Sequence, residues 1–582
     1  MMKHTLTGCL LSVFLLSIGR AELKVTGIRA IHRNGQTFVT WKDVAGGEEG
    51  SKYRYAVYRS DKPITQGDLA KASLCMERVF NNSARLFGSA FRQSDRIAPG
   101  KSTCVVEEGG EPLPDWSGLA VITPEQDGDA YYAVLATDTT ANPLTQAVAG
   151  ESSTTTPVAE KVAPIQPIKI YDSKSRKGPY IKQTCVTGKK GLPLFFTLHA
   201  SNARGGGAGS YGDYYLYFAR REWGYREGLP GVFAVQERKD KVNRLVVSNR
   251  DTIVKPDGLG PMETYWFGYV CVPQWAEHKE PRAYPFTERR VEWIAKWCVE
   301  KYKADPNRVY CSGGSMGAWG TSTWALRHPE IFAAVYPNRP RTRQRGRPSL
   351  ARVTRTQPIA MDDGKTDYFV RMDMVEFVRN HHGDLPFLGW CCGRHDGFAS
   401  FKEQIDMVKA LTEAHHGFAF AWNDGNHSSG SKPMSRVQKY YPATKFARNR
   451  SYPAFGNSSI DDDLGTCEIE VKDGRRTKRV LKPDNGALEG GINLGFDWKD
   501  VREKVDSWSA KLRNALAKNA MTVDVTPRRC QEFNPRSGDM FHWTNSAGGE
   551  GEVKADPRGL VTIPRVTIKA GEETVLTIRR VQ

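Results

Sequence analysis

Beyond its first twenty residues, the 582-residue sequence contains no run of 18 or more apolar residues, so a membrane-spanning helix is not expected there. No spacing of cysteine and histidine resembles a zinc site, and no nucleic-acid-binding motif is present. Internal repeats and low-complexity tracts are also lacking, which argues against a repeat architecture such as a propeller. With 39% hydrophobic and 10% aromatic residues, the composition is that of a globular chain. Its length predicts two to four domains.

Acidic residues are the scarcer charge, because 65 Asp and Glu face 83 Lys and Arg, a formal net charge of +18. Lys3 precedes a short apolar run at residues 10–16, which is typical of a secretory signal, and we expect cleavage after Ala21. The sequence therefore predicts a secreted or periplasmic protein. Export argues against a nucleic-acid partner, whereas an acidic polysaccharide or an anionic cell surface suits a basic exported protein.

The chain has 11 cysteines, of which Cys9 lies in the signal. The remaining ten would enter an oxidising compartment, and an even number is compatible with disulfides. Two bridges are expected because each would lie within one domain: Cys75 with Cys104, and Cys467 with Cys530. Cys311, Cys391 and Cys392 lie in apolar, strand-like runs and fit buried thiols equally well.

Strand and linker patterns divide the chain into five expected parts: a signal peptide at 1–21, a β domain at 22–150, a linker at 151–164, an α/β domain at 165–453 and a β-rich accessory domain at 454–582. In the first β domain, residues 53–59 alternate with period two, and Trp41 is a candidate core residue. This pattern resembles a fibronectin type III-like sandwich. The linker is polar and punctuated by proline.

From residue 165 onward strands alternate with helices, which predicts a parallel sheet. Buried strands are expected at residues 192–199, 264–272, 331–336, 386–391 and 418–422. Helices are expected after Thr287, as N-cap, and at residues 401–411. Short strands from residue 454 onward surround one expected amphipathic helix at 498–518, and we interpret this part as β-sandwich-like.

A Gly-x-Ser-x-Gly pentad at residues 313–317 stands between a strand-like run and a helix-compatible run. This is the setting of a nucleophile elbow, in which the serine has strained backbone and glycines allow close approach. Ser315 is therefore the candidate nucleophile. The N–H of Met316, at the start of the new helix, is the candidate oxyanion donor. The alternative is a glycine-rich turn in an inactive domain.

A serine hydroxyl needs a base, and the base needs an orienting carboxylate. His427 follows the last apolar strand and Asp396 follows the preceding one, which gives the order Ser, Asp, His of α/β-hydrolases. Four other residues remain alternatives, three of them as the acid and one as the base: Asp384, Asp406, Asp424 and His395.

The elbow and its sequel up to Val335, together with segments 192–207 and 393–427, resemble the secreted esterase branch of the α/β-hydrolases. That branch includes feruloyl and acetylxylan esterases, polyhydroxybutyrate-depolymerase-like enzymes and predicted peptidases. The resemblance covers roughly residues 165–450 and implies an α/β-hydrolase sheet without metal or cofactor. It also implies that the N–H of Ala200 completes the oxyanion hole. The family usually has His-Gly there and this chain has His199-Ala200, which leaves room for a tighter or shifted hole.

An arginine-rich segment at 338–347 should leave from the catalytic rim, where Arg339 and Arg341 are candidate ligands for a carboxylate or sulfate. The alternatives are a solvated loop, or pairing with Asp362 or Asp363. Three tryptophans near the catalytic loops either stack on a sugar or aromatic ring or belong to the core: Trp319, Trp390 and Trp422.

These features predict a secreted serine esterase that acts on carbohydrate or aryl esters. One alternative is a serine peptidase of the prolyl-oligopeptidase type, although no propeller repeat of the kind that gates such enzymes is present. A second alternative is a carbohydrate-binding or adhesive protein with a degenerate hydrolase core, to which the departure at Ala200 points.

Overall fold

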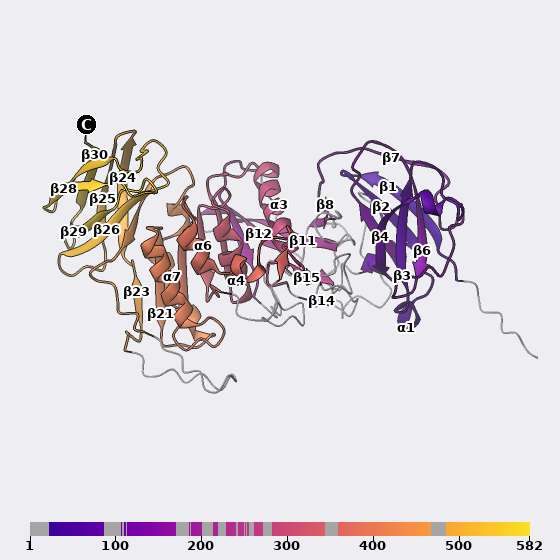
Figure 1. Cartoon of the computed structure of the whole chain (residues 1–582), viewed down its shortest axis with the longest axis horizontal. Coiled ribbons are helices and arrows are strands. Elements are labelled where there is room, and N and C mark those ends of the chain that lie inside the picture. Colours follow the sequence, from indigo (N-terminus) through magenta and orange to yellow (C-terminus); the bar gives the residue numbers. More distant parts are fainter. Residues whose placement is uncertain are drawn as a thin grey trace, which may run out of the picture. The chain divides into compact units, whose positions relative to one another are not determined.

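The computed structural model of the chain forms two compact units (Figure 1). The second contains the residues from Ala163 onward together with the described residues between 103 and 113, and the first contains the other described residues up to Val162. The structure describes residues 23–85, 106–107, 110–111, 113–169, 186, 188–200, 214–218, 229–239, 242–249, 251, 253–254, 261–262, 264–271, 282–343, 359–466 and 485–581. The predicted signal peptide and the cysteines Cys104 and Cys467 lie outside these residues. Both predicted disulfides therefore stay predictions. Among the residues that the structure describes, none of the helices has the length and apolar character needed to cross a bilayer.

The first unit contains two antiparallel sheets, as the alternating sequence pattern predicts. One has the strand order β1 (Thr26–Arg33), β2 (Gln36–Lys42), β5 (Ser117–Ile122). The other has the order β4 (Ser73–Phe80), β3 (Arg54–Ser60), β6 (Gly128–Thr137), β7 (Val158–Glu160). A short helix, α1 (Gly47–Gly50), precedes β3. Trp41 is buried, with its ring 5.2 Å from that of Tyr55, which confirms its place in the core.

The linker predicted at residues 151–164 contains a strand that the sequence did not predict. Residues 158–160 form β7, and the side chain of Glu160 is buried at its end. Glu160 pairs with Arg59 at 2.6 Å and accepts hydrogen bonds from Thr37 and Tyr132. A polar, proline-containing segment read as solvated is thus held in the sheet by partners more than twenty residues away in the sequence.

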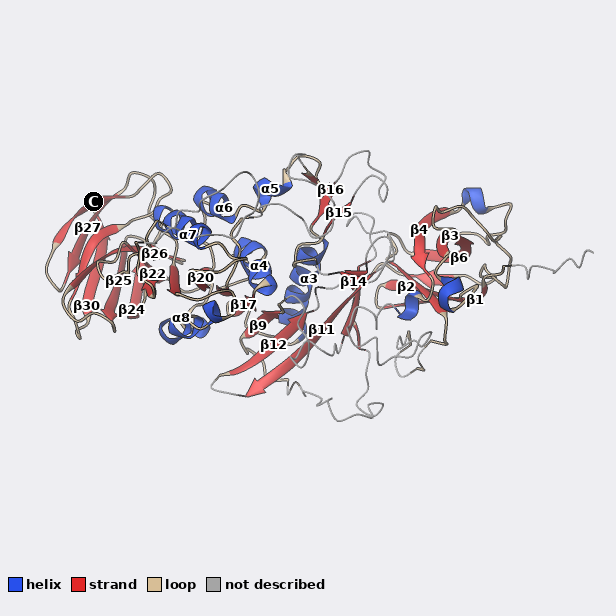
Figure 2. Cartoon of the chain, turned by 90° about the horizontal axis from the view of Figure 1, so that it is seen from below, coloured by secondary structure: helices blue, strands red, loops and turns tan. Residues whose placement is uncertain are grey.

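The second unit is built on a sheet with the strand order β23-β21-β20-β18-β17-β9-β12-β11-β10-β8 (Figure 2). Neighbours from β12 to β21 pair in parallel, and the strands outside them pair antiparallel. The bounds are β8 (Ile168–Lys169), β9 (Leu194–Leu198), β10 (Tyr214–Phe218), β11 (Leu229–Lys239), β12 (Asn243–Asn249), β17 (Val309–Gly314), β18 (Ala334–Asn338), β20 (Phe387–Gly393), β21 (Phe418–Asn423) and β23 (Gly490–Ile492). The central parallel strands are apolar because both of their faces are covered.

Helices cover the two faces of this sheet (Figure 2). They are α3 (Phe286–Lys301), α4 (Met316–Thr323), α5 (Tyr368–Arg371), α6 (Met374–Asn380), α7 (Phe401–Glu413) and α8 (Met434–Tyr440). Adjacent residues of β20 show the two faces, since successive side chains of a strand point to opposite sides. Trp390 donates to Gln404 of α7, whereas a Cβ at Gly389 would meet Val437 of α8. The thiols of Cys311, Cys391 and Cys392 are buried and free, as one of the two interpretations predicted.

The strand predicted at residues 264–272 is largely wrong. Residues 265–267 form a turn, and only β15 (Tyr269–Cys271) is a strand, in a small sheet with β16 (Arg282–Tyr284) and β19 (Ala360–Met361). The strands β13 (Ile253–Val254) and β14 (Pro261–Met262) form a separate pair. The turn forms because the carboxylate of Asp251 accepts the backbone N–H groups of Thr264 and Trp266.

Residues beyond 451 form two further sheets, consistent with a β-rich part. One has the order β22 (Tyr452–Gly456), β26 (Met521–Arg528), β29 (Ile563–Ile568). The other has the order β24 (Phe496–Lys504), β25 (Ser507–Asn514), β30 (Thr574–Arg580), β27 (Met540–Asn545), β28 (Glu550–Lys554). The helix predicted at 498–518 is wrong, because Trp508, Ala510 and Leu512 are buried with the period of two that a strand requires.

The predicted boundary at residue 454 does not separate two compact units. One hydrophobic cluster extends from Tyr336 and Phe387 of the central sheet to Trp508 of β25. The buried Arg528 binds Asp384 at 2.8 Å, and β23 returns to the central sheet to pair with β21. The β-rich part is therefore packed onto the α/β part as one body.

Candidate active site

Ser315 stands between β17 and α4 with φ 56° and ψ −115°, in the strained backbone expected of a nucleophile elbow. Glycine is required at Gly313 and Gly317, because a side chain at either position would collide with neighbouring backbone. A Cβ at Gly313 would lie 2.4 Å from the backbone of Gly317, and a Cβ at Gly317 would lie 2.1 Å from the carbonyl oxygen of Leu198. The pentad thus lets α4 start close against the end of β9.

Asp396 and His427 meet Ser315 from the ends of the next strands. His427 Nε2 lies 2.8 Å from Ser315 Oγ, and His427 Nδ1 lies 2.7 Å from Asp396 Oδ2. Asp396 follows β20 and its carboxylate is buried, while His427 follows β21 and is partly exposed. Asp396 Oδ1 accepts the backbone N–H groups of Phe398 and Ala399, both at 2.8 Å. These donors fix the carboxylate so that its other oxygen orients the imidazole.

The alternative acids and base have other partners. Asp384 binds Arg528, Asp406 binds Arg343 and Lys402, and Asp424 binds His395 at 2.9 Å. His395 is exposed on the same loop as Asp396. The structure therefore brings Ser315, Asp396 and His427 together, and the alternative acids and base lie in separate ion pairs.

The two predicted oxyanion donors follow the neighbouring parallel strands β17 and β9. Met316 is the first residue of α4, and the N–H groups at a helix start point outward. Ala200 lies two residues beyond β9, whose parallel register pairs Leu198 with Gly313, two residues before Ser315. The chain at His199 also runs against Gly317.

A buried polar network that the sequence did not predict holds the end of β9. The N–H of Asp251 donates to His199 Nε2 at 3.1 Å, which leaves the proton of a neutral imidazole on Nδ1, 3.0 Å from the carbonyl oxygen of Ala200. The Trp266 indole N–H donates to the carbonyl oxygen of His199 at 3.3 Å. Burial raises the pKa of Asp251, against hydrogen bonds from Thr264 that lower it. The available signal in the sequence was an aspartate two residues beyond the Leu-Val-Val run of β12.

The predicted substrate arginines bind the catalytic loops. Arg339, with φ 65°, donates from Nη1 to the carbonyl oxygen of His427 at 2.7 Å and to that of Ser428 at 3.3 Å. Arg341 donates from Nε to the carbonyl oxygen of Phe398 at 2.7 Å and lies over the Trp319 ring. A bond from either guanidinium to substrate stays a prediction.

The alternative pairing of these arginines with Asp362 or Asp363 is not what the structure shows. Asp362 binds Arg289, and Asp363 accepts from Thr366. The remainder of the arginine-rich segment, residues 344–347, lies outside the described residues.

The tryptophans predicted to stack on substrate are buried. Trp422 is 0% exposed and donates to the carbonyl oxygen of Ala487, and Trp390 is 1% exposed, so a sugar contact is wrong for both. Trp319 is buried between Tyr265 and Arg341, and its predicted contact with substrate has no exposed ring face to support it. The three aromatic side chains pack in the hydrophobic core. Among the described residues near the site, Phe398 has an exposed aromatic ring, and the sequence did not single it out.

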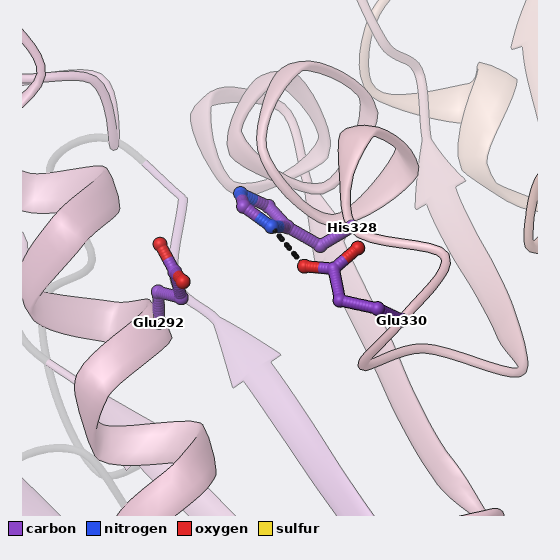
Figure 3. A group of neighbouring side chains, drawn as sticks. All are labelled: Glu292, His328 and Glu330. Carbon is purple, nitrogen blue, oxygen red and sulfur yellow. Dashed lines mark hydrogen bonds and ion pairs between the residues drawn. The ribbon is translucent and has the colours of Figure 1, made fainter.

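One group of described side chains has the composition of a metal site: Glu292 of α3, His328 and Glu330 (Figure 3). Its ligand atoms lie within 4.8 Å of one another. Each member already has a protein partner, since His328 Nδ1 lies 2.6 Å from Glu330 and Glu292 pairs with Lys296. The group comes from elements other than those that carry Ser315, Asp396 and His427.

A sequence model described as the prolyl oligopeptidase family matches residues 291–451, which include all three residues of the Ser-His-Asp arrangement. No curated protein sequence matches the chain. Among solved structures, a ferulic acid esterase is similar at 15% identity and a TM-score of 0.26, covering 45% of this chain and 87% of the other. An S-formylglutathione hydrolase from Agrobacterium tumefaciens is similar at 16% identity and a TM-score of 0.29, covering 44% and 84%.

A putative dipeptidyl aminopeptidase IV from Bacteroides ovatus is similar at 11% identity and a TM-score of 0.28, covering 57% of this chain and 46% of the other. These scores are too low for the structural likenesses to bear on the substrate. The strand order, the elbow and the family match together identify an α/β-hydrolase fold in the second unit.

Proposed function

We propose that this protein, a serine hydrolase of the α/β-hydrolase type, hydrolyses carboxylic esters of carbohydrates or of aryl compounds. The observation that carries the proposal is the continuous hydrogen-bonded arrangement of Asp396, His427 and Ser315, at 2.7 and 2.8 Å, on a nucleophile elbow. Such an arrangement activates a hydroxyl that is otherwise a poor nucleophile. It also speaks against a degenerate hydrolase core.

The chemistry follows from these positions. Ser315 Oγ attacks the ester carbonyl while His427 Nε2 takes its proton, and the N–H groups of Met316 and Ala200 stabilise the oxyanion. Collapse of the intermediate breaks the bond to the alcohol, which leaves with the proton from His427. Water then attacks the acyl-enzyme with His427 again as base, and the acid is released. Asp396 accepts the Nδ1 proton of His427 in a hydrogen bond and holds the imidazole in place throughout.

Labelling with a fluorophosphonate probe and turnover of p-nitrophenyl acetate test this proposal together. The wild type should be labelled at Ser315 and should hydrolyse the ester, and Ser315→Ala should abolish labelling and lower kcat by several orders of magnitude. Near-full turnover by Ser315→Ala would remove Ser315 from this role.

A peptidase is the second candidate, because the matching family model is that of the prolyl oligopeptidases. Against it, the described residues of the first unit form sheets of three and four strands, where a gating propeller would have repeated four-stranded blades. Cleavage of proline-linked amides without a preference for esters would reverse this ranking.

The proposal also covers the setting of the enzyme. The predicted signal peptide supports a secreted or periplasmic location, and the net charge of +18 supports an anionic polysaccharide ester among the substrates. The strand order β1-β2-β5 with β4-β3-β6-β7 supports a fibronectin type III-like first unit. N-terminal sequencing of the exported protein tests the cleavage after Ala21.

A further inference from the structure

Phe398 stands out among the exposed apolar side chains of the described residues. It is 63% exposed, and the other large exposed hydrophobic side chains that the structure describes are not aromatic. Its ring centroid lies 5.0 Å from that of His427, with the two planes inclined at 58°. An aromatic ring open to solvent therefore stands directly beside the candidate catalytic base.

The backbone of Phe398 is held at both ends by the catalytic machinery. Its N–H donates to Asp396 Oδ1 at 2.8 Å, and its carbonyl oxygen accepts from Arg341 Nε at 2.7 Å. The backbone that carries the ring is therefore coupled to the acid that orients His427. A rigidly placed ring loses less conformational entropy on binding a ligand than a ring on a free loop would.

Space is open on the solvent side of this loop. A Cβ built on the preceding residue, Gly397, would meet no atom within 4 Å. His427 Nε2 faces Ser315 Oγ at 2.8 Å, so an ester attacked by Ser315 lies next to His427, whose ring adjoins that of Phe398. An exposed phenyl ring is stabilised when a flat apolar surface covers it.

We propose that Phe398 forms an aromatic subsite that stacks against a ring of the ester substrate next to His427. This inference rests on the proposed function and names the side chain that would contact the ring of such an ester. The ligand chemistry is a flat ring with an apolar face, supplied either by an aromatic acyl group or by the sugar of the alcohol. Phe398 takes the role for which Trp319 and Trp422 were predicted.

Binding to Ser315→Ala protein tests the subsite without any turnover. Ethyl cinnamate and acetylated xylotriose serve as the aromatic and the sugar probe, and saturation-transfer NMR reports contact with their rings. At least one probe should bind, and the added change Phe398→Ala should weaken its affinity by about tenfold. Phe398→Tyr should retain the affinity. If neither probe binds, the subsite does not exist. The subsite is also ruled out if every probe that binds does so with the same affinity when Phe398 is replaced by alanine.

Kinetics with otherwise wild-type protein separate stacking from a purely positioning role. For Phe398→Ala, kcat/KM should fall about ten times more for the ring-bearing ester than for ethyl acetate, mostly through KM. Val505→Ala removes an exposed apolar side chain in the β24–β25 hairpin and should change neither value. An equal fall for all esters, through kcat, would mean that Phe398 only supports His427 and would overturn the subsite.

The two proposals fail in distinguishable ways. A protein that is not labelled by the fluorophosphonate probe, and yet binds a ring through Phe398 in the Ser315→Ala background, keeps the subsite and loses the esterase function. A protein that is labelled and hydrolyses ethyl acetate, with no dependence on Phe398, keeps the function and loses the subsite.

Discussion

At the scale of single residues, Asp396 has both carboxylate oxygens engaged. One accepts two backbone N–H groups and the other faces His427 Nδ1. An amide in the same place keeps the shape but offers an N–H where an acceptor is needed, so it stabilises the wrong tautomer of the base.

We therefore expect Asp396→Asn to lower kcat for p-nitrophenyl acetate by about 10³–10⁴-fold with an unchanged fold. Asp424→Asn is the matched control, because Asp424 follows the adjacent strand and pairs with the exposed His395. Steady-state kinetics measure kcat, and circular dichroism checks that the fold of each variant is unchanged. An equal loss in both variants would contradict the assignment of Asp396.

Arg339 binds the backbone of the loop that carries the candidate base, His427. Its guanidinium binds the carbonyl oxygens of His427 and Ser428, so its loss frees the loop that carries the imidazole. We expect Arg339→Ala to lower kcat by about tenfold to a hundredfold for a small neutral ester, since a misplaced base costs rate rather than binding. Arg379→Ala, in an exposed ion pair on α6, is the control.

The Arg339→Ala variant also separates this positioning role from the predicted role of Arg339 in binding an anionic substrate. If Arg339 instead binds an acidic substrate, KM should rise for that substrate alone, and the effect should fade as salt rises, since exposed charges are screened within about 10 Å at roughly 0.1 M. A fall in kcat for neutral and acidic esters alike would instead support the role of Arg339 in positioning His427.

At the scale of elements, the end of β2 carries a buried acid in the first unit. Asp43 is 6% exposed and accepts the N–H of Asn82, and burial raises its pKa from 3.8 to about 7. Between these two values the folded state holds a proton that the unfolded state has released. Stability from this group is therefore fully present below about pH 4 and is lost as pH rises toward about 7.

Asp43→Asn cannot ionise and should lack this dependence. We expect the free energy of unfolding of the first unit to fall between pH 5 and pH 8 by about 2–3 kcal/mol more in the wild type than in the variant. Urea denaturation at the two pH values measures it, with Asp61→Asn at the exposed turn after β3 as control. Parallel changes in wild type and Asp43→Asn would show that Asp43 is already charged in the folded state.

At the scale of the whole molecule, the chain has two compact units, and the second combines the central sheet with the two C-terminal sheets. Calorimetry should therefore show two unfolding transitions and not three. Arg528→Ala removes a buried side chain that binds Asp384 and the carbonyl oxygen of Gly383. It should lower the Tm of the larger transition by roughly 3–6 °C and leave the smaller one unchanged.

Arg513→Ala removes an arginine of the same C-terminal part that lies in an exposed ion pair, and it should shift neither transition by more than about 1 °C. Separate melting of the C-terminal sheets would contradict the single body formed by residues beyond Ala163.

The sequence by itself determined what depends on local chemistry and chain order. The pentad at 313–317 required an elbow because glycine alone tolerates the contacts at Gly313 and Gly317. The apolar runs of β9, β17, β18, β20 and β21 indicated strands buried on both faces, and strands in parallel bring their following loops to one edge. Together with the pentad and the order Ser, Asp, His along the chain, that rule led to the expectation that Ser315, Asp396 and His427 meet.

Only the tertiary structure decided which side chains face solvent and which distant partners override a local pattern. Trp422 and Phe398 are both aromatic residues close to catalytic loops, yet one is core and the other is exposed. Glu160 turned a predicted linker into a strand through partners from other strands, and Asp251 turned a predicted strand into a turn. These outcomes depend on contacts between residues far apart in the chain, which periodicity and propensity do not contain.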